Sequence, residues 1–243
     1  MHDVDQRIAQ MARRLRLGNH VVHAYKSLRL DDPGEFVEGL LAQLIEARDS
    51  ERARRNCALA GFESQKALAD FDFSVLDMPA RFSVDWLRSG QFIKDRQNLV
   101  LIGNPGTGKT HLATGLGIQC CETGGSVIFS RTTKLVDKLI RLHNAGRIAE
   151  FMKKLERCDL LILDEWGYLP INETGTRLLF EVINDCYERR SVVITTNLPL
   201  GEWNRTFGDE RLTAAMVDRL VHHGLLIRHQ GESYRIRQSL MRH

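Results

Sequence analysis

The 243-residue sequence contains no apolar run near the ~20 residues that a helix needs to cross a bilayer. Its first residues also lack the apolar core of a secretory signal peptide. The five cysteines form no C-x-x-C pair, so they support neither a zinc site nor a disulfide framework. We therefore predict an intracellular, cytoplasmic protein with buried thiols and no membrane partner.

Neither sign of charge is in large excess, because 34 lysines and arginines face 31 acidic residues. The resulting net charge of +3 neither requires nor excludes a nucleic-acid partner. The distribution is more informative: between 131 and 157, eight basic residues stand against three acidic ones. Such a cluster on predicted helices is a candidate DNA-binding surface. Its members include Lys134, Lys138, Arg141, Arg147, Lys153 and Lys154.

The most specific motif lies at 103–110, where Gly-Asn-Pro-Gly-Thr-Gly-Lys-Thr fits the Walker A pattern directly after an apolar run at 99–102. In such a loop the main-chain N–H groups surround phosphates, Lys109 reaches the β- and γ-phosphates, and the Thr110 hydroxyl ligates Mg²⁺. The sequence has no Asn-Lys-x-Asp guanine motif, so we expect ATP rather than GTP. The residues assigned to this site are Gly103, Asn104, Pro105, Gly106, Thr107, Gly108, Lys109, Thr110 and His111.

Two further segments complete the expected site. The apolar run at 160–163 ends in Asp164 and Glu165, a Walker B pattern, in which Asp164 holds Mg²⁺ and Glu165 activates the attacking water. Asn197 follows the next predicted strand and would contact the γ-phosphate or the water. Ligands of open α/β sheets sit at the carboxyl ends of the strands, where all three residues are expected.

The chain divides by pattern into two regions. We expect residues 1–66 to form a small helical domain that binds DNA or a partner, with an apolar stripe at 36–45 and with Arg52 and Arg55 as candidate DNA contacts. Basic and acidic residues there number eleven and ten, so a solvated helical surface is an equal alternative.

From 67 to 243, strands and helices alternate, which predicts an α/β fold with a five-stranded parallel sheet. The strands are expected at 99–102, 126–130, 159–163, 192–195 and 225–228. Two basic helices are expected at 132–143 and 147–156, and a helix at 174–189 beginning with a threonine cap. Only about fifteen residues follow the last strand, too few for a C-terminal lid domain.

An arginine is expected to stabilise the charge that develops on the transferred phosphoryl group, and such arginines often come from a neighbouring subunit. Arg211, Arg219 and Arg235 are the candidates, and each has the alternative of a surface salt bridge. Arg219 lies late on a predicted helix with an apolar stripe. Arg235 follows the last predicted strand and would reach the nucleotide of its own subunit.

The Walker A and Walker B segments, Thr195-Thr-Asn197, Asp218-Arg-Leu220 and Ser233-Tyr-Arg235 together resemble the IstB-like ATP-binding proteins of insertion-sequence transposition, AAA+ relatives of the DnaC helicase loaders. The resemblance implies Arg219 as the trans-acting arginine and a sensor role for Arg235. It implies that the helices at 132–156 are an insertion that touches DNA. It also implies ATP-dependent homo-oligomers that assemble on duplex DNA, remodel it and recruit a transposase.

Other functions remain open from the residues alone. A helicase loader with a replicative helicase as its partner would use the same ATP site. A small-molecule kinase would need a substrate pocket and a lid, and it has no need of a water-activating Asp-Glu pair. A scaffold that binds ATP without hydrolysing it would have no use for Glu165.

Overall fold

The computed structural model describes residues 2–18, 20–27 and 33–234 of the chain. A six-stranded sheet has the order β1-β6-β2-β5-β4-β3. The strands are β1 (Leu76–Asp77), β2 (Asn98–Gly103), β3 (Val127–Arg131), β4 (Leu160–Asp164), β5 (Ser191–Thr196) and β6 (Gly224–His229). Five are parallel, as the sequence predicts, and β1 pairs antiparallel with β6 at the edge. The sequence missed β1 because two residues carry no periodic pattern.

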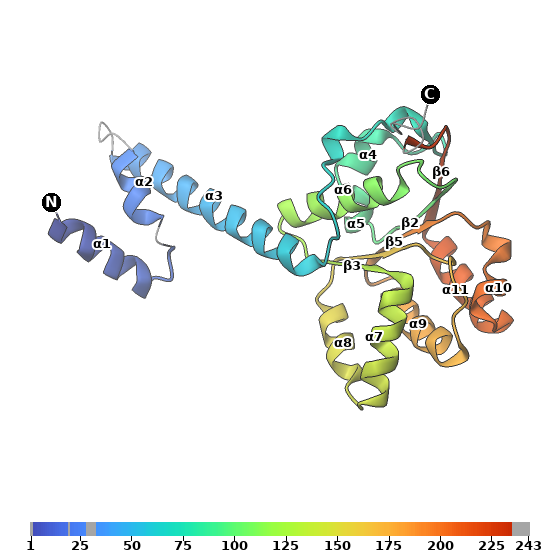
Figure 1. Cartoon of the computed structure of the whole chain (residues 1–243). Helices are drawn as coiled ribbons and strands as arrows, with labels where there is room; N and C mark the ends of the chain where they lie inside the picture. The colour runs from blue at the N-terminus through green and yellow to red at the C-terminus, as the bar shows by residue number, and fades with distance from the viewer. Residues whose placement is uncertain (1, 19, 28–32, 235–243) are drawn as a thin grey trace, which may run out of the picture.

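Helices cover both faces of the sheet (Figure 1). One face carries α4 (Val84–Arg88), α5 (Gln91–Lys94), α6 (Lys109–Glu122) and the end of α3 (Pro33–Ala60). The other carries α7 (Thr132–Asn144), α8 (Ile148–Glu156), α9 (Glu173–Cys186), α10 (Asn204–Phe207) and α11 (Glu210–His222). Short 3-10 helices lie at Leu68–Asp70, Phe73–Val75 and Leu200–Glu202.

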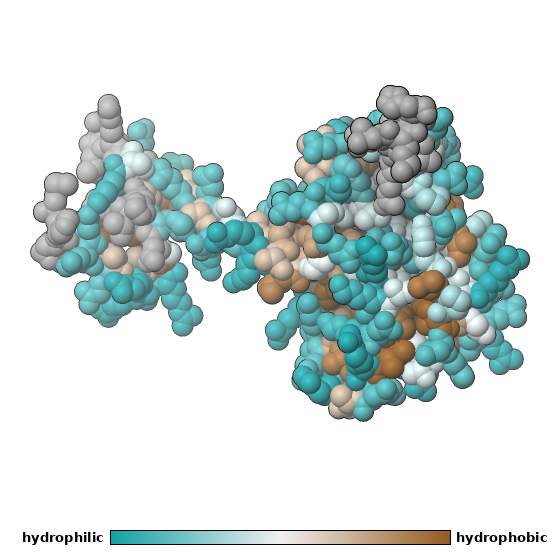
Figure 2. Space-filling view, viewed as in Figure 1, coloured by the Kyte–Doolittle hydropathy of each residue, from teal (hydrophilic) through white to brown (hydrophobic). Residues whose placement is uncertain are grey.

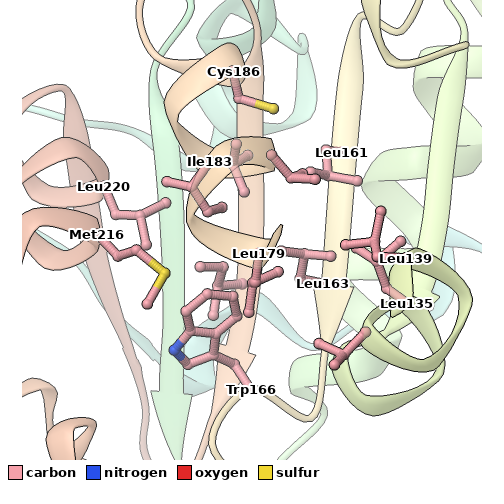
Figure 3. Packing of buried hydrophobic residues seen from close by; sticks show 14 of the residues in the cluster. Leu135, Leu139, Leu161, Leu163, Trp166, Leu179, Ile183, Cys186, Met216 and Leu220 are labelled. Atoms are coloured by element: carbon pink, nitrogen blue, oxygen red, sulfur yellow. The ribbon is translucent and has the colours of Figure 1, made fainter. Parts of the chain in front are cut away.

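Alternation along β4 explains how both faces are filled. Leu160 and Ile162 pack with the α6 side, whereas Leu161 and Leu163 pack with the α9 side. Figure 3 shows the second layer, in which Leu161 and Leu163 meet Leu179 and Ile183 of α9 and the ring of Trp166 lies below them. A strand that is buried on both faces reads as a continuous apolar run, as β4 does.

The N-terminal helices α1 (His2–Arg14) and α2 (Val21–Ser27) lie at the far end of the 28-residue α3, away from the sheet (Figure 1). The other end of α3 packs on the α/β body, where Asn56 Nδ2 donates to the carbonyls of Gly124 and Gly125 at 3.2 and 2.8 Å. The predicted stripe at 36–45 is only half-buried, and Leu41 and Ile45 are 51% and 61% exposed. Two short helices offer α3 too little apolar surface to cover it. Figure 2 shows mainly hydrophilic side chains over this region.

The remaining differences are local. The helix expected at 174–189 begins at Glu173, and its N-cap is Asn172, whose side chain accepts a hydrogen bond from the Gly175 N–H at 2.8 Å. Asparagine is as good a cap as threonine, so the pattern alone did not separate them. Cys57 is half-buried, while the other four cysteines are buried as predicted. None of the described helices is long and apolar enough to span a membrane.

Candidate functional site

The loop between β2 and α6 has the backbone of a phosphate cradle. Gly106 and Gly108 have φ values of +82° and +88°, a region that glycine adopts readily and other residues rarely do. A Cβ on Gly106 would lie 2.9 Å from the Cβ of Ser233 and one on Gly108 would lie 3.0 Å from the Phe71 ring. Both positions are therefore restricted to glycine by conformation and by space, which supports the Walker A assignment.

Lys109 begins α6 and is 7% exposed. Its ammonium donates to the main-chain carbonyls of Gly103 and Asn104, both at 2.8 Å, so it is held at the mouth of the loop. The Thr107 hydroxyl donates to the Asn104 carbonyl at 2.8 Å and tightens the same turn. The N-terminus of α6 adds the positive end of its dipole to this position. A polyanion is the ligand that such a loop accommodates.

Asp164 at the end of β4 is the centre of the expected metal site. The Thr110 hydroxyl donates to its Oδ1 and Oδ2 at 2.9 and 3.2 Å, and the Thr195 hydroxyl forms a second, short hydrogen bond to Oδ1. Asp164 is 4% exposed. Hydroxyl and carboxylate oxygens are the hard ligands that Mg²⁺ prefers. The side chains of Thr110 and Asp164 thus fit Mg²⁺. Of the residues that contact the Asp164 carboxylate, sequence reasoning missed Thr195.

Glu165 leaves the strand with a φ of +58°, which is uncommon for a residue with a side chain. Its main-chain N–H donates to the Thr195 hydroxyl at 3.1 Å, and its carboxylate lies 3.5 Å from the guanidinium of Arg131. Arg131 also pairs with Glu63 at 2.7 Å. The hydrogen bond that Arg131 donates to Glu63, together with the charge of Glu165, raises the pKa of Arg131 above its ordinary value. One guanidinium thus connects the proposed base to the segment after α3.

Sequence reasoning did not find the Arg131 contact, because the partners are 34 and 68 positions away and no local pattern links them. The end of β3 lies beside the end of β4 in the register, with Arg131 opposite Asp164. Predicting the contact between Arg131 and Glu165 would therefore have required the order of the strands in the sheet. Thr132 adds to this corner, because its hydroxyl donates to the Asp164 carbonyl at 3.0 Å.

Two buried acceptor atoms border the site without a hydrogen-bond partner among the described residues: Asn197 Oδ1 and His229 Nε2. Asn197 follows β5 beside the end of β4, as predicted for a sensor. His229 Nδ1 lies 3.1 Å from the Thr107 carbonyl, so this nitrogen carries the proton and Nε2 is an acceptor. Burial, with a smaller contribution from Lys109, lowers the pKa of His229 to about 4.

Other predicted residues lie elsewhere. Arg219 contacts its own subunit, since its Nε donates to Asn184 Oδ1 at 3.0 Å and its guanidinium lies 5.1 Å from the centre of the Phe180 ring. Arg235 lies outside the described residues, while Tyr234 N donates to the Gly106 carbonyl at 2.9 Å. His111 Nε2 lies 2.9 Å from the Ala67 carbonyl. Arg211 is an exposed residue in the first turn of α11.

The predicted DNA-contacting residues fall in two places. Lys134, Lys138 and Arg141 share α7, while Lys153 and Lys154 lie on the neighbouring α8, and all five are exposed. Arg147 is paired with Glu150 through two hydrogen bonds of 2.7 and 2.9 Å. Arg52 and Arg55 lie on α3, where Arg52 packs against Gly124 rather than beside α7. The fold therefore places six of the eight candidates on α7, on α8 or at the N-cap of α8, and two on α3.

Comparison with known proteins gives a consistent result. The sequence profile of the IstB-like ATP binding proteins matches residues 23–241. An insertion-sequence ATP-binding protein of Sinorhizobium fredii is 38% identical over 206 residues, which is 84% of this chain and 69% of the relative. The insertion sequence IS21 ATP-binding protein of Pseudomonas aeruginosa is 36% identical over 173 residues, 71% of this chain and 65% of the relative.

Solved structures are similar at the level of the fold. AMPPCP-bound DnaA from Aquifex aeolicus has a TM-score of 0.57 at 20% identity, and the match covers 73% of this chain and 54% of the DnaA chain. The DnaC helicase loader has a TM-score of 0.50 at 23% identity, and the match covers 61% of this chain and 92% of the DnaC chain. The predicted AAA+ P-loop fold is confirmed, with six strands where five were expected.

Proposed function

The chain belongs to the family of IstB-like ATP binding proteins, and from this premise we propose that it is a Mg²⁺-dependent ATPase that binds duplex DNA during insertion-sequence transposition. In this proposal ATP assembles copies of the chain on DNA, and the assembly remodels the DNA and recruits a transposase. Hydrolysis then releases the assembly. Residues 67–243 would form the ATPase part, and residues 1–66 a DNA- or partner-binding part.

The residues around the phosphate loop would divide the binding of ATP among them. The main-chain N–H groups of 103–110 and the Lys109 ammonium would hold the β- and γ-phosphates. Thr110 and Asp164 would hold Mg²⁺, which when bound neutralises charge that develops between these phosphates. Arg235, two residues after Ser233, is proposed to contact the same nucleotide.

Hydrolysis needs a base and an orienting group on the side of the γ-phosphate away from ADP. Glu165 is proposed to accept the proton of the attacking water. The unpartnered Oδ1 of Asn197 would accept the second hydrogen bond from that water, and its Nδ2 group would donate to a phosphate oxygen. Arg131 lies against the Glu165 carboxylate, so this carboxylate would separate from Arg131 before it accepts the proton.

The DNA surface of this proposal is formed by α7 and α8. Lys138 is close enough to Lys154 and Arg141 to feel their charges. Burial lowers the pKa of Lys138, and these two cations lower it further. Cations held near one another attract an anion such as a DNA phosphate. Arg52 and Arg55 would make a second, separate contact from α3.

Assembly is proposed to place Arg219 of one copy at the ATP of the next. Asn98 at the start of β2 donates to the Arg219 and Leu220 carbonyls at 3.4 and 3.3 Å, whereas the phosphate loop follows the other end of this strand. A strand of six residues covers roughly 17 Å, so Arg219 is too far from its own loop to contact that nucleotide. If Arg219 takes part in hydrolysis, it therefore acts on the ATP of a neighbouring copy.

The observation that carries the proposal is the convergence of Thr110, Asp164 and Asn197 at one edge of the sheet beside a glycine-restricted loop. The direct test is to measure the particle size of the purified protein with and without duplex DNA. Each sample is measured with ADP and with a non-hydrolysable ATP analogue. We expect a large assembly only with the analogue, and larger still with DNA.

Lys109→Ala supplies the matched variant for that experiment. It removes the phosphate-binding ammonium and should abolish analogue-dependent assembly, because no triphosphate is held to join two copies. Lys94→Ala, an exposed lysine on α5, is the control and should assemble normally. Full assembly of Lys109→Ala, or a monomer under every condition, would contradict the proposal.

The likeness to the DnaC helicase loader supports one alternative partner, a replicative helicase. Both functions use the same ATP site, so the partner separates them. Pull-down of this protein with a transposase and with a replicative helicase, in the presence of the ATP analogue, distinguishes the two. Retention of the helicase alone would favour the loader.

A further inference from the structure

A second group of metal-ligating side chains lies at the edge of the sheet opposite the phosphate loop. Glu188 is in the turn between α9 and β5, while His222 and His223 are at the end of α11, just before β6. One potential ligand atom of each residue lies within 4.8 Å of those of the other two. The proposed ATPase uses none of the three.

We propose that Glu188, His222 and His223 bind a divalent transition-metal ion, with Zn²⁺ as the best fit. Two imidazoles and one carboxylate are an established zinc ligand set, with water in the fourth position. Imidazole nitrogen favours zinc, copper and nickel over magnesium and calcium. This site would therefore take a different class of ion from the one at Thr110 and Asp164.

The spacing of the ligand atoms suits this coordination. Bonds of ~2.0–2.1 Å in a tetrahedron place neighbouring ligand atoms roughly 3.3 Å apart. Nε2 of His223 and Oε1 of Glu188 already lie 3.1 Å apart. The side chains of His223 and Glu188 are 42% and 58% exposed, so small rotations can complete the site without moving the backbone.

Local backbone structure explains why two consecutive histidines converge. Successive residues of a continuing helix point about 100° apart. Here α11 ends at His222, and His223 leaves it with φ and ψ of −112° and 32°, so the two ring centres are only 4.3 Å apart. Glu188 is held on the other side, where Arg96 Nη1 donates to its main-chain carbonyl at 3.1 Å.

A further contact is of the kind that supports metal ligands. The Tyr187 hydroxyl lies 2.9 Å from Nδ1 of His222, so it is placed to fix the orientation of that ring. Metal-bound histidines usually have such a partner on their second nitrogen. An ion pair between His223 and Glu188 alone does not require the His222 ring, whose centre lies 4.3 Å from that of His223.

Four of the five thiols are poorly suited to form a competing site. Burial raises the pKa of Cys158 to about 11, and burial raises the pKa values of Cys120 and Cys186 to about 12. Burial also raises the pKa of Cys121. Thiolates are the metal-binding form of cysteine, so these four side chains remain protonated at neutral pH.

An ion at this site would join the end of α11 to the turn after α9. An ion that binds the folded chain and not the unfolded chain raises its stability in proportion to the logarithm of free ion over Kd. Zinc binding should therefore raise the melting temperature of the protein. It should do so without nucleotide, because the site lies apart from the phosphate loop.

The test is a Zn²⁺ titration of the metal-free, full-length protein in competition with a chromophoric chelator. Excess Mg²⁺ is present and nucleotide is absent. We expect one Zn²⁺ per chain and a higher melting temperature. His222→Ala and His223→Ala should each weaken binding by more than about tenfold, and Glu188→Gln should weaken it as well.

His20→Ala is the matched control. His20 Nε2, in the turn before α2, lies 2.9 Å from Glu51 Oε1 of α3 in an exposed histidine–glutamate pair. Among the side chains that the structure describes, no third ligand completes that pair, so zinc affinity should not change. The proposal is overturned if no saturable binding occurs, or if the double variant His222→Ala/His223→Ala binds Zn²⁺ as the wild type does. Far-UV circular dichroism checks that each variant is folded.

Discussion

At the scale of the residue, Asp164 is the point at which the site is organised. Two hydroxyls, from Thr110 and Thr195, donate to one buried carboxylate that a third element, β4, presents. Buried carboxylates persist when their oxygens are hydrogen-bonded, and these bonds also fix where a cation would be held. The hydrogen bonds that stabilise the buried Asp164 carboxylate are therefore also the ones that fix its position.

Glu165→Gln tests the assignment of the base. The amide keeps the size of the side chain but cannot accept the proton of water, so ATP binding should be retained and turnover should fall by about 10²–10⁴-fold. Nucleotide binding by fluorescence and phosphate release by a coupled assay measure the two effects separately. Normal turnover of this variant would mean that another group is the base.

His229 gives a pH dependence with a definite sign. Its pKa is about 4 in the folded chain against 6.5 for the ordinary group, so the unfolded chain binds the proton more readily. Stability is therefore complete above about pH 6.5 and is lost as the pH falls toward 4, by about 2 kcal/mol at pH 5. Urea unfolding at pH 7 and pH 5 measures this loss.

His229→Gln provides the comparison for that measurement. It keeps a group that can donate toward the Thr107 carbonyl, and it has no proton to gain between pH 7 and pH 5. The loss of stability over this range should shrink by most of the predicted amount. An unchanged pH dependence would show that other groups cause it.

At the scale of the element, α7 and α8 illustrate how a charge cluster becomes a surface. Their apolar residues, such as Leu135, Leu139 and Leu155, pack on the sheet and on α9. The lysines are left on the outside, and Lys138 Nζ lies 5.4 Å from the centre of the Phe151 ring. The amphipathic pattern therefore buries the apolar face of each helix and leaves the basic face at the surface.

Lys138→Ala and Lys154→Ala test that surface. Each should weaken binding to duplex DNA of any sequence and should reduce the slope of log K against log salt by about one, because one phosphate contact is lost. Fluorescence anisotropy over a range of salt concentrations gives the slope. Lys94→Ala, with the same charge change on another surface, should leave the slope as it is. Equal slopes for all four proteins would place the DNA elsewhere.

At the scale of the whole molecule, the two ends of the parallel strands have different uses. The carboxyl ends of β2, β4 and β5 hold the proposed ATP site, and the other edge holds Arg219. A hollow of about 680 Å³ lies beside Arg219, with Asn184, Tyr187 and Phe180 among its lining residues. An assembly in which one edge meets the other would complete each ATP site with a neighbour's arginine.

A mixing experiment tests this arrangement. Arg219→Ala and Lys109→Ala should each lose ATPase activity, the first by the order of 10³-fold, which is typical when a trans-acting arginine is removed. Mixed together, they should regain part of the activity, because an intact loop meets an intact arginine at some junctions. Arg211→Ala is the control and should remain active. No recovery on mixing would remove Arg219 from the trans role.

The sequence by itself determined the elements and the chemistry carried by contiguous residues. Helix and strand periods, the glycine positions of the loop and the carboxylates that end β4 are local patterns, so they predicted the α/β fold and the positions of Lys109, Thr110, Asp164 and Asn197. They also located both basic helices to within one residue at each end.

Only the tertiary structure decided which distant side chains meet. Strand order placed Thr195 on Asp164 and Arg131 on Glu165, and the ends of two helices brought His222, His223 and Glu188 together. It also left Leu41 and Ile45, two residues of an apolar stripe, exposed on α3. These contacts depend on the packing of segments that are separated in the chain, and a periodic pattern records which face of a segment is apolar but not what covers it.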